Sequence, residues 1–430
     1  MVDKKRKNRE IVLLVYTFFI VLCILLLVKL YKGLYPGKQE TMDKKSIEIE
    51  IWTIHGDIET ALNQSIAKYQ EQFPELEFKV KVFKNEVYQS AIANAMVTDT
   101  LPDIFFCWGY QKLKDYVDAD TILDITDYVN KKGILKDMKL GVMDGFTFNG
   151  RYYAMPLYGW NASLFCNRRM FEQNHLSYPN SFEEFLEVVR ILKEKDIIPI
   201  SCGGKEAWLP SLYYMSLVLD GGTIRNVYEA AQDVRKFNTE PFIKAAEKLE
   251  QLINLKPWQE NYDEYDSYNA AYLFTQGKTA MLLTGSWVSL AIDGPDSKVK
   301  GEVDVIPFPK ANPTQGVGGY VDTYVMSRKS VLAQNQNYIN LYLDLMQSIA
   351  GISCNELGIG VSVYKNQYAD KTKFPTLAQC SLREENITYH PAYDQIFSAQ
   401  LTNHYYELLS TFLVGEIDSK KFIEDLSESR

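Results

Sequence analysis

The part of the sequence that most constrains the fold is residues 274–287, which read FTQGKTAMLLTGSW. A helix is expected to end near Gln276, because Gly277 can adopt the left-handed conformation that terminates helices. The apolar run 280–283, bounded by turn signals, is typical of a buried parallel strand. A new helix should follow, with Trp287 in its first turn. Open α/β sheets bind ligands where strand carboxyl ends meet helix N-termini, so this stretch predicts an α/β fold with Trp287 at a ligand-binding edge.

Composition narrows the classes of protein to consider. A chain of 430 residues has room for two or three domains of about 100–200 residues each. The net charge of −9 argues against nucleic acid or an anionic membrane surface as a partner. Four histidines disfavour a histidine-rich metal site, and no cofactor motif is present. The aromatic content of 13% fits either a large core or a sugar-stacking cleft.

The six cysteines do not form a C-x-x-C pair, so a zinc ribbon is not indicated. Cys107, Cys166 and Cys202 lie in apolar, strand-like runs and are interpreted as small buried hydrophobic residues. A disulfide among the cysteines outside the N-terminal apolar run remains open.

The N-terminus reads as a membrane anchor. Residues 1–10 are basic, and residues 11–28 form an uncharged apolar run of 18 residues, which meets the length of about 18 needed to cross a bilayer. No small-residue cleavage site follows, which favours an uncleaved signal-anchor over residues 11–30. The basic segment would stay in the cytoplasm, residues 31–45 would form a tether, and the body would lie outside the cell membrane. A lipoprotein signal at Cys23 and a cleaved signal peptide remain alternatives.

The next part of the chain alternates strand-like and helix-like runs. These follow in the order 46–53, 58–73, 78–83, 86–97 and 101–108. This β-α-β-α-β order predicts a parallel sheet with right-handed crossovers. Trp52, Asp57 and Trp108 are expected near strand carboxyl ends, where they would line one rim. Trp208 follows the strand-like run 197–202 and is compatible with either a cleft or a core position.

Several motifs resemble one known family. Residues 274–287 resemble the signature G-K-x-A-M-x-x-x-G-x-W of extracytoplasmic solute-binding proteins of ABC sugar importers, the maltose-binding-protein-like family 1. Weaker likenesses occur in the family's order: "P-D-[IV]" at 102–104, "G-x-x-Y-x-x-P" at 150–156, a helix start at 179–185 and a crossover at 316–327. The resemblance covers most of residues 46–350.

This resemblance implies a two-lobed periplasmic-binding-protein fold preceded by one N-terminal transmembrane helix. Each lobe would be a mostly parallel sheet flanked by helices, and the lobes would close on a ligand by hinge motion. The first lobe would comprise residues 46–157 plus 322–349, and the second lobe residues 158–321 plus 350–430.

The resemblance also implies a ligand site. Tyr158, Trp160 and Asn161 would face the cleft from one crossover, and Tyr320 and Asp322 from the other. Together with the positions above, the candidate ligand-binding residues are Trp52, Asp57, Trp108, Tyr158, Trp160, Asn161, Trp208, Trp287, Tyr320 and Asp322.

The implied function is binding of a mono- or oligosaccharide outside the cytoplasm and its delivery to ABC permease subunits by a monomer, without catalysis, metal or cofactor. One alternative is an anchored sugar sensor that presents its ligand to a membrane receptor kinase. A weaker alternative is an extracellular glycosidase, which would need two carboxylates at a set separation. The sequence offers no such pair in a recognisable frame, and no G-x-S-x-G, H-E-x-x-H or P-loop motif.

Overall fold

The computed structural model describes residues 17, 20–27, 29–30, 46–139, 141–383 and 387–428. The chain divides into two units, Met1–Ile47 and Glu48–Arg430. Among the described residues, no helix has the length and apolar character required to cross a membrane. The predicted basic segment and tether lie outside the described residues, as does much of the predicted anchor, of which 20–27 are helical.

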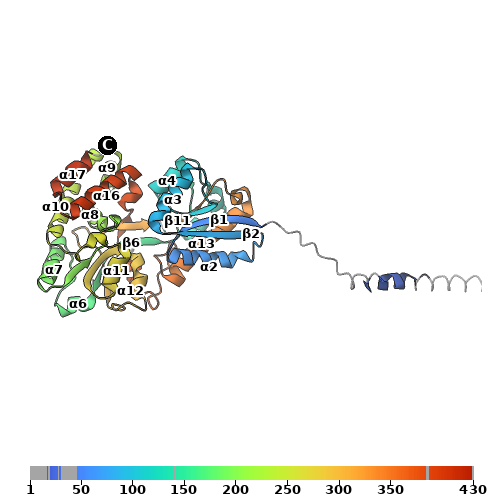
Figure 1. Ribbon diagram of the computed structural model, residues 1–430, viewed down its shortest axis with the longest axis horizontal. Helices are drawn as coiled ribbons and strands as arrows, with labels where there is room; N and C mark the ends of the chain where they lie inside the picture. The colour runs from blue at the N-terminus through green and yellow to red at the C-terminus, as the bar shows by residue number, and fades with distance from the viewer. Residues whose placement is uncertain are drawn as a thin grey trace, which may run out of the picture. The chain divides into compact units, whose positions relative to one another are not determined.

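The body contains two large sheets (Figure 1). We call the elements built around the first sheet the first lobe and those around the second sheet the second lobe. The first sheet has the strand order β11-β3-β1-β2. Its strands are β1 (Ile47–Ile54), β2 (Leu76–Phe83), β3 (Ile104–Trp108) and β11 (Asp322–Met326).

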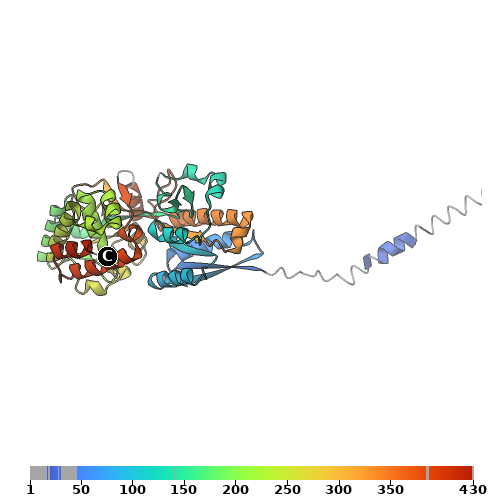
Figure 2. The same ribbon diagram turned by 90° about the horizontal axis from the view of Figure 1, so that it is seen from above.

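The first sheet confirms the predicted alternation of strands and helices. Helices α2 (Asp57–Gln70) and α3 (Asn85–Val97) connect β1, β2 and β3, and β1 pairs in parallel with β3. Strand β11 is antiparallel to β3, with Asp322 opposite Trp108. Helix α13 (Gln336–Gly351), orange in Figure 2, packs against α2 and β11.

The rest of the first lobe is made of short elements. They are α4 (Gln111–Asp118), α5 (Thr126–Lys132), the 3-10 helices η1 (Ile134–Asp137), η2 (Asp144–Phe146) and η6 (Val331–Gln334), the hairpin strands β4 (Thr147–Phe148) and β5 (Arg151–Tyr152), and the π-helix η7 (Ile352–Leu357). The predicted hairpin turns at Asn149 and Gly150, both with positive φ (51° and 73°), as a tight hairpin turn requires.

The second sheet has the order β12-β10-β6-β8-β7, with β9 also paired to β6. Its strands are β6 (Gly159–Asn167), β7 (Ile198–Ser201), β8 (Thr279–Gly285), β9 (Val303–Ile306), β10 (Gln315–Tyr320) and β12 (Thr388–His390). The prediction of a mostly parallel sheet is wrong here, because β6 is antiparallel to β8, β9 and β10. Strand β6 runs from the first lobe into the second, and β10 runs back towards the first lobe. Because β6 and β10 are neighbours in the sheet, they must be antiparallel.

Both faces of the second sheet are covered by helices, which explains why every residue of β6 and β8 is buried. One face packs in a core that includes residues of α7 (Phe182–Glu194), α8 (Trp208–Gly221), α9 (Ile224–Gln232), α10 (Glu240–Asn254), α15 (Tyr393–Ile396), α16 (Ala399–Leu413) and α17 (Ser419–Ser427). The other face packs with α11 (Ser267–Thr275), α12 (Ser289–Asp293) and α14 (Pro375–Arg383). The remaining elements are α6 (Arg168–Gln173), η3 (Val234–Phe237), η4 (Tyr262–Glu264) and η5 (Ser286–Val288).

Local predictions in this lobe are confirmed. Helix α11 ends before Gly277, which has φ 65°, and β8 follows as a fully buried strand parallel to β7. The Ser181 hydroxyl accepts a hydrogen bond from the Glu184 N–H at the start of α7. Cys107, Cys166 and Cys202 are buried, and all six cysteines are free.

The lobes are connected where β6 and β10 pair side by side. Gly318 lies opposite Asn161 and Gly319 opposite Trp160. At Gly318, a side-chain Cβ would stand 2.4 Å from the Trp160 carbonyl oxygen, so only glycine permits this approach. A third segment joins them through two backbone hydrogen bonds between Gly159 and Val361.

Candidate functional site

Three tryptophans of the second lobe form one cluster at the carboxyl end of β8. The Trp287 ring lies 5.0 Å from the Trp160 ring and 5.7 Å from the Trp208 ring, tilted by 58° and 61°. Trp160 is 8% exposed, whereas Trp208 and Trp287 are partly exposed. We call these three residues the tryptophan cluster.

The position of Trp287 depends on Gly285, the last residue of β8. A Cβ atom on Gly285 would stand 2.0 Å from the nearest ring atom of Trp287. The indole therefore folds back over the end of its own strand, which brings it against Trp160 and Trp208. A glycine is needed at position 285, two residues before Trp287, because a side chain there would collide with the Trp287 ring.

The first lobe contributes aromatic rings to the same apolar core. Trp108, the last residue of β3, and Tyr110 both pack against the apolar core that contains Trp160. Tyr110 has φ 60°, and its N–H donates to the Gly145 carbonyl at 2.7 Å. Rings from both lobes thus pack against one apolar core.

A lysine and an aspartate connect the two lobes. Lys112 in α4 lies with its ammonium 4.7 Å from the centre of the Trp108 ring, a cation–π contact. The same ammonium forms an ion pair at 3.0 Å with Asp394 in α15 of the second lobe. Both side chains are mostly buried, so this pair is screened less by solvent than a surface pair.

Sequence reasoning missed both Lys112 and Asp394. Lys112 follows Trp108 by four residues and lies in the first turn of the helix after the strand. That spacing could have predicted a contact between Lys112 and Trp108. No local sequence pattern singles out Asp394, because its contact is with Lys112, which lies 282 residues away in the sequence.

Two predicted site residues carry carboxyl groups. Asp322 lies on the second crossover, and Asp57 lies shortly after the end of β1. The hydroxyl of Tyr158, on the first crossover, hydrogen-bonds Asp322 on the second. Burial raises the pKa of Asp322 to about 7, against the opposing effects of the Tyr158 hydrogen bond and the Lys112 charge. Asp57, the first residue of α2, is exposed, and desolvation by nearby protein atoms raises its pKa while His55 opposes the rise.

Tyr320 is the remaining predicted residue on the crossovers. Its ring lies over Gly159, where a Cβ would stand 2.6 Å from the nearest ring atom. The Lys139 ammonium lies 5.9 Å from the centre of the same ring. Tyr320 is partly exposed.

Two predicted residues are held by contacts inside their own lobes. The Trp52 indole N–H donates to Glu50 Oε1 at 2.7 Å, and its ring packs on Phe83 at 5.0 Å. Trp52 lies inside β1 and not in the loop after it. We therefore give it a packing role on the face of the first sheet covered by α3.

Asn161 also has a structural role. Its side chain is fully buried, its amide nitrogen donates to the Cys380 carbonyl at 3.2 Å, and its amide oxygen accepts from the Ser163 hydroxyl at 3.2 Å. Both ends of the amide are engaged by the protein, on the sheet face opposite Trp160. Asn161 fixes α14 to the second sheet and is dropped from the site that we propose.

Across the described part of the chain, no group of three or more histidine, cysteine, aspartate or glutamate side chains is arranged to hold a metal ion. The candidate site combines aromatic rings, Asp322 on the second crossover and one interlobe ion pair, and no hydrogen bond or ion pair among the described residues joins Asp57 to them. This combination is suited to binding a ligand with both apolar faces and hydroxyl groups.

Comparisons with known proteins show the family and the fold. The family described as bacterial extracellular solute-binding protein matches residues 55–334, more than half of the chain. A multiple sugar-binding protein of Streptococcus mutans is 21% identical over 291 residues. That alignment covers 65% of this chain and 66% of the relative, just under two thirds of its length.

Solved structures share the fold. A structure from a study of xylan utilization by Caldanaerobius polysaccharolyticus superposes with a TM-score of 0.82 at 23% identity, covering 89% of this chain and 99% of that one. A chitin oligosaccharide binding protein gives a TM-score of 0.79 at 21% identity, covering 89% and 98%. The two-lobed α/β fold and the match over residues 55–334 lead to one conclusion: this chain belongs to the family of bacterial extracellular solute-binding proteins.

Proposed function

We propose that this chain binds a carbohydrate, a mono- or oligosaccharide, between its two lobes outside the cytoplasm. The observation that carries the proposal is that the tryptophan cluster and Trp108 of the other lobe pack in or against one apolar core. Flat aromatic faces stack on the C–H faces of a pyranose, and a partly exposed ring keeps a face for that purpose. The names of the similar proteins, which refer to sugars, xylan and chitin oligosaccharide, support the same ligand class.

The polar part of the proposed site consists of carboxyl groups. Asp57 and Asp322 can accept hydrogen bonds from sugar hydroxyls, and a protonated Asp322 can also donate one. Neither residue has the partner needed for bond cleavage in a recognisable geometry, so we propose that the ligand is bound and released unchanged. The proposed ligand-binding residues are Asp57, Trp108, Tyr158, Trp160, Trp208, Trp287, Tyr320 and Asp322.

We propose lobe boundaries close to those expected from the sequence. The first lobe comprises residues 46–157 and 322–349, and the second lobe comprises 158–321 and most of 350–430. The packing of η7 with α2 and α13 favours extending the first lobe through Leu357, so that the chain crosses again near Val361.

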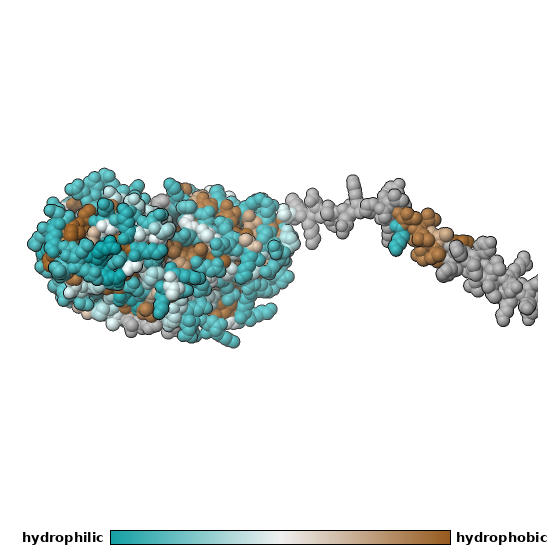
Figure 3. Space-filling view, turned by 90° about the horizontal axis from the view of Figure 1, so that it is seen from below, coloured by the Kyte–Doolittle hydropathy of each residue, from teal (hydrophilic) through white to brown (hydrophobic). Residues whose placement is uncertain are grey.

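We propose delivery of the sugar, by a monomer, to the permease subunits of an ABC importer. The alternative is an anchored sensor that presents the bound sugar to a membrane receptor kinase. An N-terminal anchor over residues 11–30 suits both, and the exposed apolar side chains within residues 20–27, brown in Figure 3, support it. Extraction of membranes with alkaline carbonate tests the anchor, because an integral anchor keeps the protein in the pellet.

Isothermal titration calorimetry tests the ligand class. The purified chain is titrated with xylo-, chito-, gluco- and galacto-oligosaccharides and with their monosaccharides. We expect saturable heat with at least one sugar and no release of new reducing ends, which a glycosidase would produce. Absence of binding across the whole panel contradicts the proposal. Sugar uptake in a strain lacking the permease genes then separates importer from sensor.

A further inference from the structure

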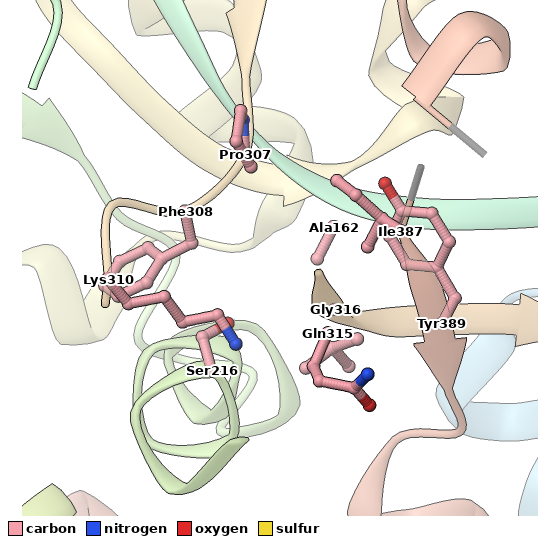
Figure 4. A pocket seen from close by; sticks show the side chains of 10 residues that line it. Ala162, Ser216, Pro307, Phe308, Lys310, Gln315, Gly316, Ile387 and Tyr389 are labelled. Carbon is pink, nitrogen blue, oxygen red and sulfur yellow. The ribbon is translucent and has the colours of Figure 1, made fainter. Parts of the chain in front are cut away.

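A small pocket lies in the second lobe, apart from the tryptophan cluster (Figure 4). Its walls come from α8, from β10 and β12, and from the loop that joins β9 to β10. The polar side chains among its lining residues are Ser216, Lys310, Gln315 and Tyr389. The cavity volume is about 10 Å³, which is enough for one water-sized occupant.

Lys310 is an unusual feature of this pocket. The residue is only 3% exposed, and its ammonium has no hydrogen-bond partner in the described part of the chain. Figure 4 shows its side chain reaching into the pocket interior from the side of Phe308. Burial of a charge without a partner is strongly unfavourable, so this group needs either a counter-ion or loss of its proton.

Asp220, a carboxylate that acts on Lys310, does not supply that counter-ion. Asp220 attracts Lys310 electrostatically. However, its two oxygens are already engaged, one by the Lys248 ammonium at 2.6 Å and the other by the Asn312 N–H at 2.9 Å. Two lysines thus share one carboxylate, and Lys248 holds the short contact. The local charge is positive.

The remaining walls offer donors and no carboxylate. The lining residues include the Ser216 hydroxyl and the Gln315 amide, and none of them is an aspartate or glutamate. Gln315 Oε1 accepts a hydrogen bond from His390 Nε2, which leaves the amide N–H groups of Gln315 for other acceptors. Burial and the charge of Lys310 lower the pKa of His390, so His390 adds no second positive charge near neutral pH.

We propose that this pocket is a halide site, in which one chloride ion lies against the Lys310 ammonium with Ser216 as a further donor. A monatomic anion fits a space sized for one water, and sulfate, phosphate and carboxylates each need a larger space. The bound ion neutralises the buried ammonium and thereby stabilises the second lobe. This proposal is independent of the carbohydrate site.

Thermal unfolding of the full-length chain tests the proposal. Chloride and bromide are compared with sulfate and methanesulfonate at equal ionic strength, so that general screening is the same in each sample. We expect halides alone to raise the unfolding midpoint, by several degrees at roughly 100 times the dissociation constant. Burial lowers the pKa of Lys310 to about 8, so the halide effect should be present at pH 6.5 and much weaker at pH 9.5. Equal midpoints in all four salts at pH 6.5 contradict the proposal.

Two variants locate the effect. Lys310→Met keeps the length of the side chain and removes its charge, and we expect it to fold and to lose the halide response. The control Lys193→Met, at an exposed position of α7, should keep the full response. Ser216→Ala should weaken halide binding by about tenfold or less, as expected for one lost hydrogen bond. A halide response that survives in Lys310→Met places the ion elsewhere and overturns the proposal.

Crystals grown with bromide give an independent readout. We expect an anomalous peak within hydrogen-bonding distance of Lys310 Nζ. A water molecule at that position, with no anomalous signal at saturating bromide and pH 6.5, shows instead that the lysine is solvated or neutral and overturns the halide assignment.

Discussion

Truncation of Trp287 is the sharpest test of the proposed carbohydrate site. In Trp287→Ala the ligand loses one stacking face at the centre of the tryptophan cluster. Stacking of a nucleic-acid base on an aromatic side chain is worth about 1–3 kcal/mol. On that scale, the dissociation constant of the preferred sugar should rise by about 5- to 150-fold. Calorimetric titration measures this change directly.

The structure also sets the expected change in stability. Trp287 contacts both Trp160 and Trp208, and each aromatic pair contributes about 0.5–1.5 kcal/mol beyond area burial. The free energy of unfolding should therefore fall by about 1–3 kcal/mol.

A matched tryptophan separates loss of affinity from loss of stability. Trp258, also in the second lobe, is 8% exposed and contacts two rings, Tyr213 at 5.9 Å and Tyr262 at 4.7 Å. Trp258→Ala should lower stability by a similar amount and leave sugar affinity unchanged. If Trp287→Ala keeps wild-type affinity, or if both variants lose affinity equally, Trp287 is a packing residue and the proposed site is wrong.

Three further outcomes are expected. Gly285→Ala should weaken sugar binding as strongly as Trp287→Ala in calorimetry, because its new Cβ would displace the indole. A double-mutant cycle of unfolding with Lys112→Met and Asp394→Asn should give a coupling energy of about 1 kcal/mol, and this energy should fall at high salt. If the effects of the two substitutions simply add, the ion pair contributes nothing to stability. The raised pKa of Asp322 means that the folded state binds more protons than the unfolded state between about pH 4 and 7. Denaturant titrations should therefore show stability falling as pH rises through that window, by up to about 1.4 kcal/mol per pH unit, and Asp322→Asn should remove this slope.

Local sequence patterns predicted much of the fold because they report local physics. The helix stop at Gly277, the buried strand β8 and the cap at Ser181 each depend on a few neighbouring residues. The parallel pairing of β1 and β3 followed from the spacing of apolar runs. The direction of β6 against its neighbours depended on how the chain passes between lobes, which no local pattern encodes.

The candidate site was less predictable for the same reason. The sequence identified aromatic residues near strand ends, but it could not tell which face of a strand each side chain occupies. Trp52 and Asn161 lie on faces where protein groups engage their polar atoms. Lys112 reaches its position beside Trp108 through a contact with Asp394, far away in sequence.

The crossovers link ligand contact to hinge motion. We expect any closure of the lobes to bend the backbone near Tyr158 and near Asp322, where the two crossovers run together. The Tyr158 hydroxyl is hydrogen-bonded to Asp322 at this point, and Trp160 follows two residues later. A sugar that contacts Trp160 and Asp322 therefore acts on the bending segments themselves. A ligand shifts the equilibrium between two arrangements of the lobes only by the difference in its affinity for them. Ligand contacts with residues on the hinge change most directly between the two arrangements, so they contribute to that difference. The interlobe pair of Lys112 and Asp394 adds a ligand-independent contribution to any arrangement of the lobes in which the two side chains meet.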